Sequence, residues 1–321
     1  MIYGNVPGID RPVSRLVQGT MMMNPNDHDA AFAIMDAFFE AGGNIFDTAH
    51  VYGNGASERV LGRWLKERGL RDEIIILGKG AHPTQDRNRV TSFDIAADIH
   101  DSLARMQVEY IDLYLLHRDD PEQPVGAIVE ALNEQHAAGR IGAFGGSNWT
   151  TDRIQAANEY AAAHGLRPFV ASSPNFSLAE QAVPPWPGCV SISGPGQAAA
   201  RQWYLENGVS LFTWSSLAGG FFSGRFERDN LDSFEDGYDQ LCVKVYGQEE
   251  NFKRLDRVRE LAAKKNASVP QIAMAYVLAQ PQGIFALVGS RNAAEVETNV
   301  AATSVQLSQE EVAWLELRRE N

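Results

Sequence analysis

Four polar side chains with complementary proton chemistry follow short apolar runs in the first 117 residues of the chain: Asp47, Tyr52, Lys79 and His117. A tyrosine hydroxyl has an ordinary pKa of about 10, so it exchanges protons poorly at neutral pH. An ammonium such as Lys79 would lower that pKa, and a carboxylate such as Asp47 would hold the ammonium in place. His117 could donate a hydrogen bond to the same oxygen that Tyr52 protonates. Together they predict a site that polarises and protonates a carbonyl group.

Each of these four residues also has a purely structural interpretation. Asp47 could cap a turn, and Tyr52 could be a half-buried aromatic residue. Lys79 could face solvent at the end of a strand, and His117 could be a core histidine bonded to backbone. The chemical interpretation therefore depends on whether the fold brings the four together.

Short apolar runs alternate with longer segments of helical period, which is typical of repeated βα units. Eight such runs predict a (β/α)8 TIM barrel, in which reactive groups lie at the carboxyl ends of the strands. The predicted strands are Leu16–Gly19, Asn44–Asp47, Ile74–Lys79, Ile111–His117, Ile141–Gly146, Phe169–Ser172, Ser210–Thr213 and Phe285–Val288.

The segments between these strands have the helical period, and nothing in the sequence divides residues 1–321 into more than a single barrel domain. A doubly wound sheet would require a Gly-x-Gly-x-x-Gly turn after an early strand, which is missing. The predicted helices are Asp29–Ala41, Ser57–Glu67, Phe93–Met106, Val125–Ala138, Thr151–His164, Gly196–Glu206, Glu249–Lys265, Val269–Leu278, Asn292–Ala301 and Ser308–Arg318.

Two interruptions of the βα pattern are candidate substrate loops. Ala179–Pro195 is rich in Pro and Gly, and Arg225–Gly247 carries a run of acidic residues. Loops after the strands shape the site of a barrel enzyme. A solvated surface excursion is the alternative for the second.

Composition limits the kinds of partner. The chain is 44% hydrophobic with a net charge of −13, which disfavours nucleic acid and anionic membrane surfaces. Cys189 and Cys242 form no Cys-x-x-Cys pair, so neither a disulfide framework nor a metal site is expected. The lack of a signal sequence and of a long apolar run predicts a cytoplasmic protein.

Short motifs in order along most of the chain resemble those of the aldo-keto reductases. These are barrel enzymes that transfer a hydride from NADPH to an aldehyde or ketone. The motifs are the run from Asn44 to Gly53 (NIFDTAHVYG), Ser57-Glu58, Leu61-Gly62, Lys79, Leu115-Leu116-His117, Gly139-Arg140-Ile141, Gly145-Gly146-Ser147-Asn148, Leu217-Ala218-Gly219-Gly220, Ser223-Gly224, Val288-Gly289-Ser290-Arg291 and Asn299.

The resemblance implies that Asp47, Tyr52, Lys79 and His117 form the catalytic tetrad, with Tyr52 as the general acid. It implies a cofactor site for NADPH, with NADH less favoured, made by Ser147, Asn148, Ser173, Trp214, Ser215, Leu217, Gly219, Gly289, Ser290, Arg291 and Asn299.

Within that set, the resemblance assigns individual contacts. Ser147 and Asn148 would bond the nicotinamide carboxamide, although they could also cap the helix at Thr151. Trp214 would stack on the nicotinamide, although packing is an alternative. Arg291 would meet the 2′-phosphate, although it could be a solvated surface residue.

The sequence departs from the family pattern at both ends of the expected cofactor. Where many members have Gln-Pro-x-Tyr, this chain has Ser173-Pro174-Asn175-Phe176, so water or Asn175 would have to replace the Gln contact, or affinity falls. At the phosphate end, Val288 replaces a proline, while Glu295 and Thr298 stand where Gln or Arg and Glu are common.

A small-molecule carbonyl compound is the expected partner, and self-association into a homo-oligomer is left open. Two other functions are weighed: a nucleotide-binding regulatory subunit that acts through a protein partner, and a lyase using Lys79 as a Schiff-base nucleophile. His50 could contact a polar substrate or make a structural hydrogen bond. The expected substrate wall consists of Met21, His50, Tyr52, Trp149 and Trp186.

Overall fold

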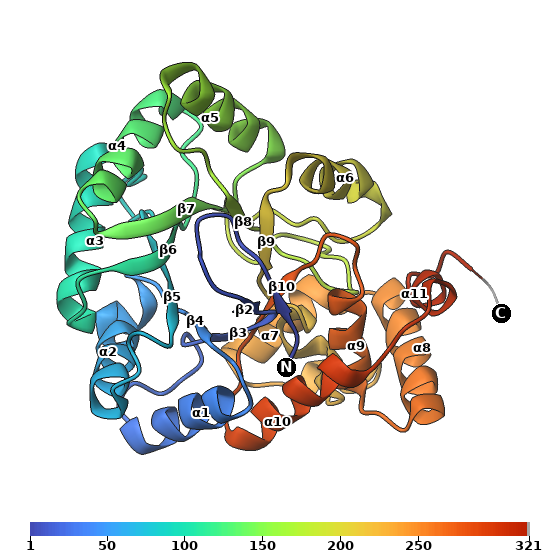
Figure 1. Cartoon of the computed structure of the whole chain (residues 1–321). Coiled ribbons are helices and arrows are strands. Elements are labelled where there is room, and N and C mark those ends of the chain that lie inside the picture. The colour runs from blue at the N-terminus through green and yellow to red at the C-terminus, as the bar shows by residue number, and fades with distance from the viewer. Residues whose placement is uncertain (320–321) are drawn as a thin grey trace.

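Eight parallel strands form a closed barrel in the computed structural model, which describes residues 1–319 (Figure 1). The predicted TIM barrel is confirmed, and each predicted strand is present with its ends within two residues. The strands are β3 (Leu16–Gly19), β4 (Ile45–Asp47), β5 (Ile75–Gly80), β6 (Ile111–Leu116), β7 (Ile141–Ser147), β8 (Ala171–Ser173), β9 (Ser210–Thr213) and β10 (Phe285–Val288).

The barrel closes between its first and last strands. Leu287 of β10 pairs with Val17 of β3, and Phe285 pairs with Phe212 of β9 on the other side. All eight strands run in the same direction, so their carboxyl ends meet at one mouth.

Alternation of side chains along each strand separates two apolar cores. Val17, Ile45 and Ile75 point into the barrel, where they are fully buried with other strand residues. Leu16 and Phe46, one residue away, belong to the layer between strands and helices. This period of two explains why the strands read as continuous apolar runs: both faces are covered.

A short antiparallel hairpin lies across the amino-terminal end of the barrel (Figure 1). It consists of β1 (Tyr3–Gly4) and β2 (Val13–Ser14). Val6 and Val13 join the apolar cluster inside the barrel. The hairpin therefore covers this end of the barrel.

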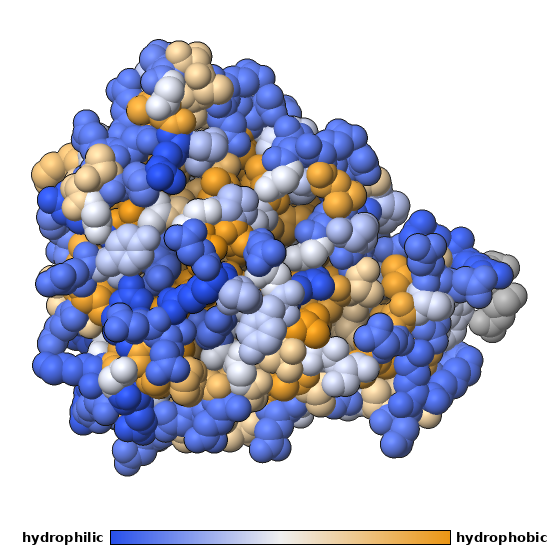
Figure 2. Space-filling model, viewed as in Figure 1, coloured by the Kyte–Doolittle hydropathy of each residue, from blue (hydrophilic) through white to orange (hydrophobic). Residues whose placement is uncertain are grey.

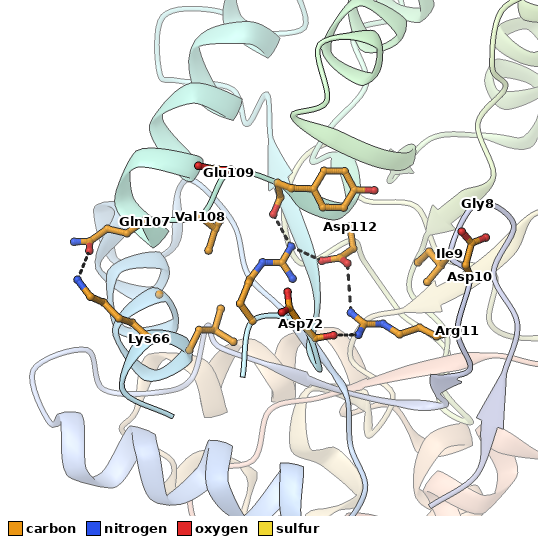
Figure 3. Close-up of a pocket in the computed structure, with 14 residues that line it drawn as sticks. Gly8, Ile9, Asp10, Arg11, Lys66, Asp72, Gln107, Val108, Glu109 and Asp112 are labelled. Atoms are coloured by element: carbon orange, nitrogen blue, oxygen red, sulfur yellow. Dashed lines mark hydrogen bonds and ion pairs between the residues drawn. The ribbon is translucent and has the colours of Figure 1, made fainter. Parts of the chain in front are cut away.

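A cleft of about 840 Å³ lies beside the hairpin, lined by charged side chains that precede β5 and begin β6 (Figure 3). Arg71 donates to the carbonyls of Ile74 and Tyr110 and pairs with Asp112. These contacts tie two strand starts together. His117 follows the far end of the six-residue β6, roughly 20 Å away. The cleft is thus separate from the predicted reaction site.

Helices surround the barrel (Figure 1), and the face of the molecule in Figure 2 is mostly hydrophilic with apolar patches between the polar residues. No helix within residues 1–319 has the length and apolar character needed to cross a membrane. The helices are α1 (His28–Glu40), α2 (Ala56–Arg68), α3 (Ser92–Met106), α4 (Val125–Ala137), α5 (Thr151–His164), α6 (Ala198–Asn207), α7 (Gly237–Tyr246), α8 (Glu249–Lys265), α9 (Val269–Leu278), α10 (Ala293–Ala301) and α11 (Gln309–Leu315), with short 3-10 turns η1 (Tyr52–Gly55), η2 (Pro195–Gln197), η3 (Ala218–Ser223), η4 (Leu231–Ser233) and η5 (Ala302–Ser304).

One of the two candidate substrate loops, Arg225–Gly247, contains a helix that the sequence did not predict. Asp236 starts α7 because its carboxylate accepts hydrogen bonds from the backbone of Tyr238 and Asp239. Cys242, Val245 and Tyr246 then form a buried face. The other predicted loop, Ala179–Pro195, contains no helix or strand before η2 begins at Pro195.

Candidate active site

The structure brings the four predicted acid–base residues together at the carboxyl ends of three consecutive strands. Asp47 ends β4, Lys79 lies near the end of β5, and His117 follows β6 directly. Tyr52 opens the turn after β4, with its ring centre 5.7 Å from that of His117 and 5.3 Å from the Lys79 ammonium. The four side chains thus form one group around a phenol.

Backbone hydrogen bonds beyond the strand ends hold this group in register. The backbone N–H of His50 donates to the carbonyl of Lys79 at 2.8 Å, and that of His117 donates to Gly80 at 2.7 Å. These bonds continue the parallel ladder past its last paired residues. Rigid strand ends, rather than mobile loops, therefore position Lys79 and His117.

Asp47 and Lys79 form a buried ion pair. Burial raises the pKa of the Asp47 carboxyl and lowers that of the Lys79 ammonium, and in both cases the attraction between the partners opposes the effect of burial. A buried pair of this kind depends on both members, because either charge alone would lack compensation.

The Tyr52 hydroxyl behaves differently from the sequence-based expectation. Burial raises the pKa of Tyr52 well above its ordinary value, and the negative charge of Asp47 raises it further. The expected lowering of this pKa by Lys79 is therefore wrong: the ammonium is paired with Asp47, and burial outweighs the opposing positive charge, which is that of Arg118. The phenol keeps its proton at neutral pH.

His117 is a neutral imidazole at neutral pH. Burial lowers its pKa well below the ordinary value, and the nearby positive charge of Lys79 adds to the effect. Its Nδ1 atom has no hydrogen-bond partner within residues 1–319. His82, from the loop after β5, lies edge-on to the His117 ring with 4.9 Å between ring centres. This second histidine was not predicted.

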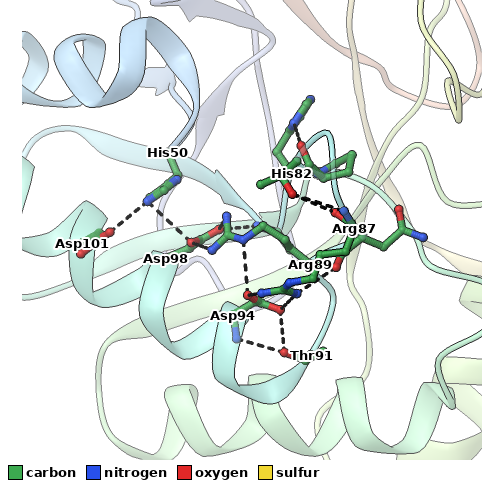
Figure 4. A network of polar contacts seen from close by, with 12 residues as sticks. His50, His82, Arg87, Arg89, Thr91, Asp94, Asp98 and Asp101 are labelled. Atoms are coloured by element: carbon green, nitrogen blue, oxygen red, sulfur yellow. Dashed lines mark hydrogen bonds and ion pairs between the residues drawn. The ribbon is translucent and has the colours of Figure 1, made fainter.

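A network of ion pairs fixes the loop that carries His82 (Figure 4). Asp98 of α3 accepts a hydrogen bond from the backbone of Ala81 and pairs with Arg89. Ala81 has a φ of 58°, in the left-handed region that alanine rarely adopts. The Asp98 contact supports this strained turn and so determines where His82 stands.

Arg118 was also missed, although it directly follows His117 in the chain. It is 9% exposed, and it donates to the His117 carbonyl at 2.8 Å and to the Cys189 sulfur at 3.4 Å. An arginine next to a predicted active-site histidine was the available signal. The βα pattern gave no reason to place its side chain inside the site rather than in solvent.

Asn148 lies at the centre of the predicted nicotinamide end. Both of its amide N–H groups donate within the protein, to the His117 carbonyl and the Ser147 hydroxyl. Its side-chain oxygen accepts from Val190 and from the indole of Trp214 at 3.2 Å. A cofactor carboxamide would have to replace one of these bonds. The capping alternative is wrong, because Thr150 caps α5.

Ser147 and Ser173 contact each other across β7 and β8. The Ser147 hydroxyl donates to the Ser173 carbonyl at 3.0 Å, and the backbone N–H of Asn148 donates to the same carbonyl. The two serines thus contact each other, and their role in binding the cofactor stays a prediction.

Asn175 does not replace the glutamine of the family pattern. Its side chain is fully buried, accepts from the Ser191 hydroxyl at 2.8 Å and donates to the carbonyl of Trp214. It thereby attaches the Ala179–Pro195 loop to the end of β9. The expectation that Asn175 might contact the nicotinamide is wrong, because its polar atoms serve this structural role.

The residues of the predicted cofactor site in the turn after β9 are notable for their backbone conformation rather than for their side chains. Ser215 and Gly219 have φ angles of 52° and 62°, and Leu217 and Trp214 are half-buried. Gly220 has a φ of 99°, and a side chain there would meet no atom within 4 Å. This segment therefore leaves open space at Gly220.

Arg291, at the start of α10, is already paired within the protein. Glu295 accepts from the Arg291 backbone N–H at 2.9 Å and approaches its guanidinium at 3.3 Å. Asn299 donates to the buried Ser290 hydroxyl, and the adjacent Gly289 is exposed. An anion at this helix start would have to compete with the Glu295 carboxylate.

The predicted substrate wall is only partly supported by exposure. Met21 and Trp186 are 40% and 42% exposed. Trp149 is fully buried against Phe169, and its indole donates to the Arg118 carbonyl, so its place in the wall is wrong. His50 pairs with Asp101 of α3 at 3.1 Å, which supports the structural alternative for this residue.

A parallel barrel that places a phenol, an imidazole and an ion pair at neighbouring strand ends is suited to proton transfer at a carbonyl oxygen. The sequence profile of the aldo/keto reductase family matches residues 15–317. The chain belongs to this family.

Curated relatives include reductases and alcohol dehydrogenases. A norsolorinic acid reductase of Emericella nidulans is 28% identical over 93% of this chain and 74% of its own. A probable aryl-alcohol dehydrogenase of Saccharomyces cerevisiae is 27% identical over 92% of this chain and 89% of its own. An aryl-alcohol dehydrogenase (NADP(+)) of Phanerodontia chrysosporium is 27% identical over 96% and 83%. The protein is thus an oxidoreductase of carbonyl and alcohol groups that uses a nicotinamide cofactor.

Proposed function

We propose that this protein reduces an aldehyde or ketone to an alcohol with NADPH, and that Tyr52 is the proton donor. The observation that carries this proposal is the convergence of Tyr52, His117 and the Lys79–Asp47 pair at the ends of β4, β5 and β6.

The bound cofactor supplies a hydride to the carbonyl carbon. The protein's own residues act on the carbonyl oxygen. The Tyr52 hydroxyl, which burial keeps protonated, donates its proton to that oxygen as negative charge develops. Neutral His117 donates a hydrogen bond to the same oxygen and fixes its direction. Lys79, held by Asp47, places a positive charge beside the phenolate that remains.

The residues at the end of β9 suit a nicotinamide dinucleotide. The half-buried Trp214 ring is held by Asn148 at 3.2 Å, which presents an aromatic surface beside the reacting group. The turn that contains Leu217, with Ser215 and Gly219 in the left-handed region, would present its backbone to a pyrophosphate. Ser290 and Arg291 at the start of α10 would bind the adenosine end, with Asn299 supporting Ser290.

NADPH is proposed over NADH because of Arg291 and because a relative carries NADP(+) in its name. A guanidinium at a helix start favours a 2′-phosphate by charge and by hydrogen bonding. Glu295 opposes this preference, since its carboxylate already forms an ion pair with the Arg291 guanidinium. The preference for NADPH is therefore expected to be modest.

The other functions are less well supported. The regulatory-subunit alternative finds no support among the relatives named above, and it gives no reason for a complete acid–base group. The lyase alternative would use Lys79 as a nucleophile, yet its nitrogen is engaged with Asp47. The Ala179–Pro195 loop and α7 are proposed to shape the substrate site. Cytoplasmic location and homo-oligomer formation stay predictions from the sequence.

The test is to follow NADPH absorbance with a panel of aromatic and aliphatic aldehydes, ketones and sugars. The proposal expects consumption that depends on both the carbonyl compound and Tyr52. Consumption of no compound in either direction, with NADPH or NADH, would contradict it. Trapping of a carbonyl compound on Lys79 by borohydride, without cofactor oxidation, would favour the lyase.

A further inference from the structure

Arg118 is a buried cation without a carboxylate partner. No Asp or Glu within residues 1–319 forms an ion pair with its guanidinium, although two acidic residues follow it in the chain. Asp119 is bound by Arg153 at 2.8 and 3.0 Å, and Asp120 accepts from the backbone of Glu122. Buried arginines are normally paired, because an uncompensated charge away from water is costly.

The two contacts that Arg118 does make leave its charge uncompensated. The His117 carbonyl is neutral, and burial raises the pKa of the Cys189 thiol, so the sulfur is not a thiolate at neutral pH. Two of its five N–H groups are used, one of them on a weak sulfur acceptor. The remaining donors are available to a ligand.

The charges of the site sum to a positive value. Lys79 and Asp47 cancel each other, Tyr52 is protonated, and His117 is neutral. Among these five residues Arg118 thus leaves one net positive charge, in a chain whose total charge is −13. A local charge opposite to that of the whole protein is a reason to look for an anionic ligand.

The position of Arg118 suits recognition of substrate. Its side chain lies beneath the Ala179–Pro195 loop, where a Cβ at Gly188 would be 3.7 Å from the Arg118 Cδ. It follows His117, whose ring is within 5.7 Å of the Tyr52 ring centre. Arg291, which is proposed to bind the cofactor phosphate, follows a different strand, β10, whereas Arg118 follows β6.

We propose that the Arg118 guanidinium, held between the His117 carbonyl and Cys189, binds an anionic group of the substrate, so that the protein acts on negatively charged carbonyl compounds. The anion is a carboxylate or a phosphate, both of which accept two parallel hydrogen bonds from a guanidinium. This inference rests on the proposed function for the reaction itself, and it adds the class of substrate.

The test compares matched carbonyl compounds that differ in charge: 4-carboxybenzaldehyde with its methyl ester, and glyceraldehyde 3-phosphate with glyceraldehyde. The quantity is the ratio of kcat/KM for the anionic compound to that for its neutral partner. In the wild type, one ratio should be about 10 to 100. The pair of compounds that gives this ratio shows whether the recognised anion is a carboxylate or a phosphate. Arg118→Gln should bring that ratio close to 1, and Arg118→Lys should give an intermediate value.

Arg153→Gln is the matched control, because this guanidinium is already paired with Asp119, the residue that follows Arg118 in the chain. It should keep the wild-type ratio. Three results would overturn the inference. The first is an equal fall of the ratio in Arg118→Gln and Arg153→Gln, and the second is a wild-type ratio near 1 for both pairs of compounds. The third is a loss of cofactor affinity in Arg118→Gln as large as its fall in the ratio.

Binding of benzoate and benzamide, followed by tryptophan fluorescence, gives a readout that does not need turnover. Benzoate should bind at least about tenfold more tightly than benzamide, and Arg118→Gln should abolish the difference. If no carbonyl compound is reduced but benzoate still binds through Arg118, the reductase proposal fails and the anion site stands. If neutral carbonyls are reduced and benzoate binds no better than benzamide, the reductase stands and the anion site fails.

Discussion

The Lys79 ammonium contacts the Asp47 carboxylate between the ends of two adjacent strands, and both side chains are almost completely buried. The pair lies directly below the Tyr52 ring, 5.3 Å from the ammonium. It therefore has two roles that can be separated: it compensates two buried charges, and it places a positive charge next to the phenol.

Replacing one member of the Lys79–Asp47 pair should damage both stability and activity. Lys79→Met leaves a buried carboxylate without a partner, which we expect to lower the free energy of unfolding by about 3–5 kcal/mol. The double variant Lys79→Met with Asp47→Leu removes both charges and should recover most of this loss. Neither variant should reduce carbonyl compounds at the wild-type rate. Urea unfolding and NADPH consumption measure the two effects, and a double variant with restored activity would contradict the proposed role of Lys79.

Tyr52→Phe should remove the proton donor while leaving the surroundings unchanged. We expect kcat for reduction to fall by about 10²–10⁴-fold, since that is the usual contribution of a general acid. Affinity for NADPH, measured by quenching of tryptophan fluorescence, should change little. Near-normal turnover of the variant would show that another group donates the proton.

The sequence predicts the strands well because both of their faces are buried. Val17 inside the barrel and Leu16 outside it are equally apolar, so β3 is visible as a continuous run. The helix α7 was missed because its buried residues Cys242, Val245 and Tyr246 follow a run of acidic residues that suggests a solvated loop. The local sequence pattern shows the period and polarity of a segment, but it does not show which other part of the protein packs against a short apolar face.

The part of the candidate site that was predicted consists of the residues whose positions are set by the ends of the strands. Asp47, Lys79 and His117 follow from counting strands, since their side chains are placed by the sheet itself. The environment was not predictable in the same way. The pKa of Tyr52 depends on how completely the loops bury it, and the burial of Trp149 depends on Phe169, twenty residues later. Arg118 was missed because the βα pattern does not show whether a side chain just after a strand enters the site or faces solvent.

Stability should depend on pH through the two histidines near the site. The pKa values of His117 and His82 are lowered in the folded protein, chiefly by burial. Below about pH 6.5 the unfolded chain takes up protons that the folded chain does not, so stability decreases as the pH falls. His117→Asn should reduce this slope by up to about 1.4 kcal/mol per pH unit. Urea unfolding between about pH 7.5 and about pH 5.5 measures it, and an unchanged slope would mean that His117 can be protonated in the folded state.

The choice of cofactor should depend on Glu295, because its carboxylate competes with a 2′-phosphate for Arg291. Glu295→Gln removes the competing charge, and we expect KM for NADPH to fall by about 2- to 5-fold relative to KM for NADH, as suits an exposed ion pair. Glu297→Gln, two residues along the same helix and exposed, controls for the loss of a negative charge. Arg291→Ala should act in the opposite direction and raise KM for NADPH more than for NADH. Equal effects of Arg291→Ala on both cofactors would mean that this arginine does not read the phosphate, and the preference would then have to come from elsewhere in the site.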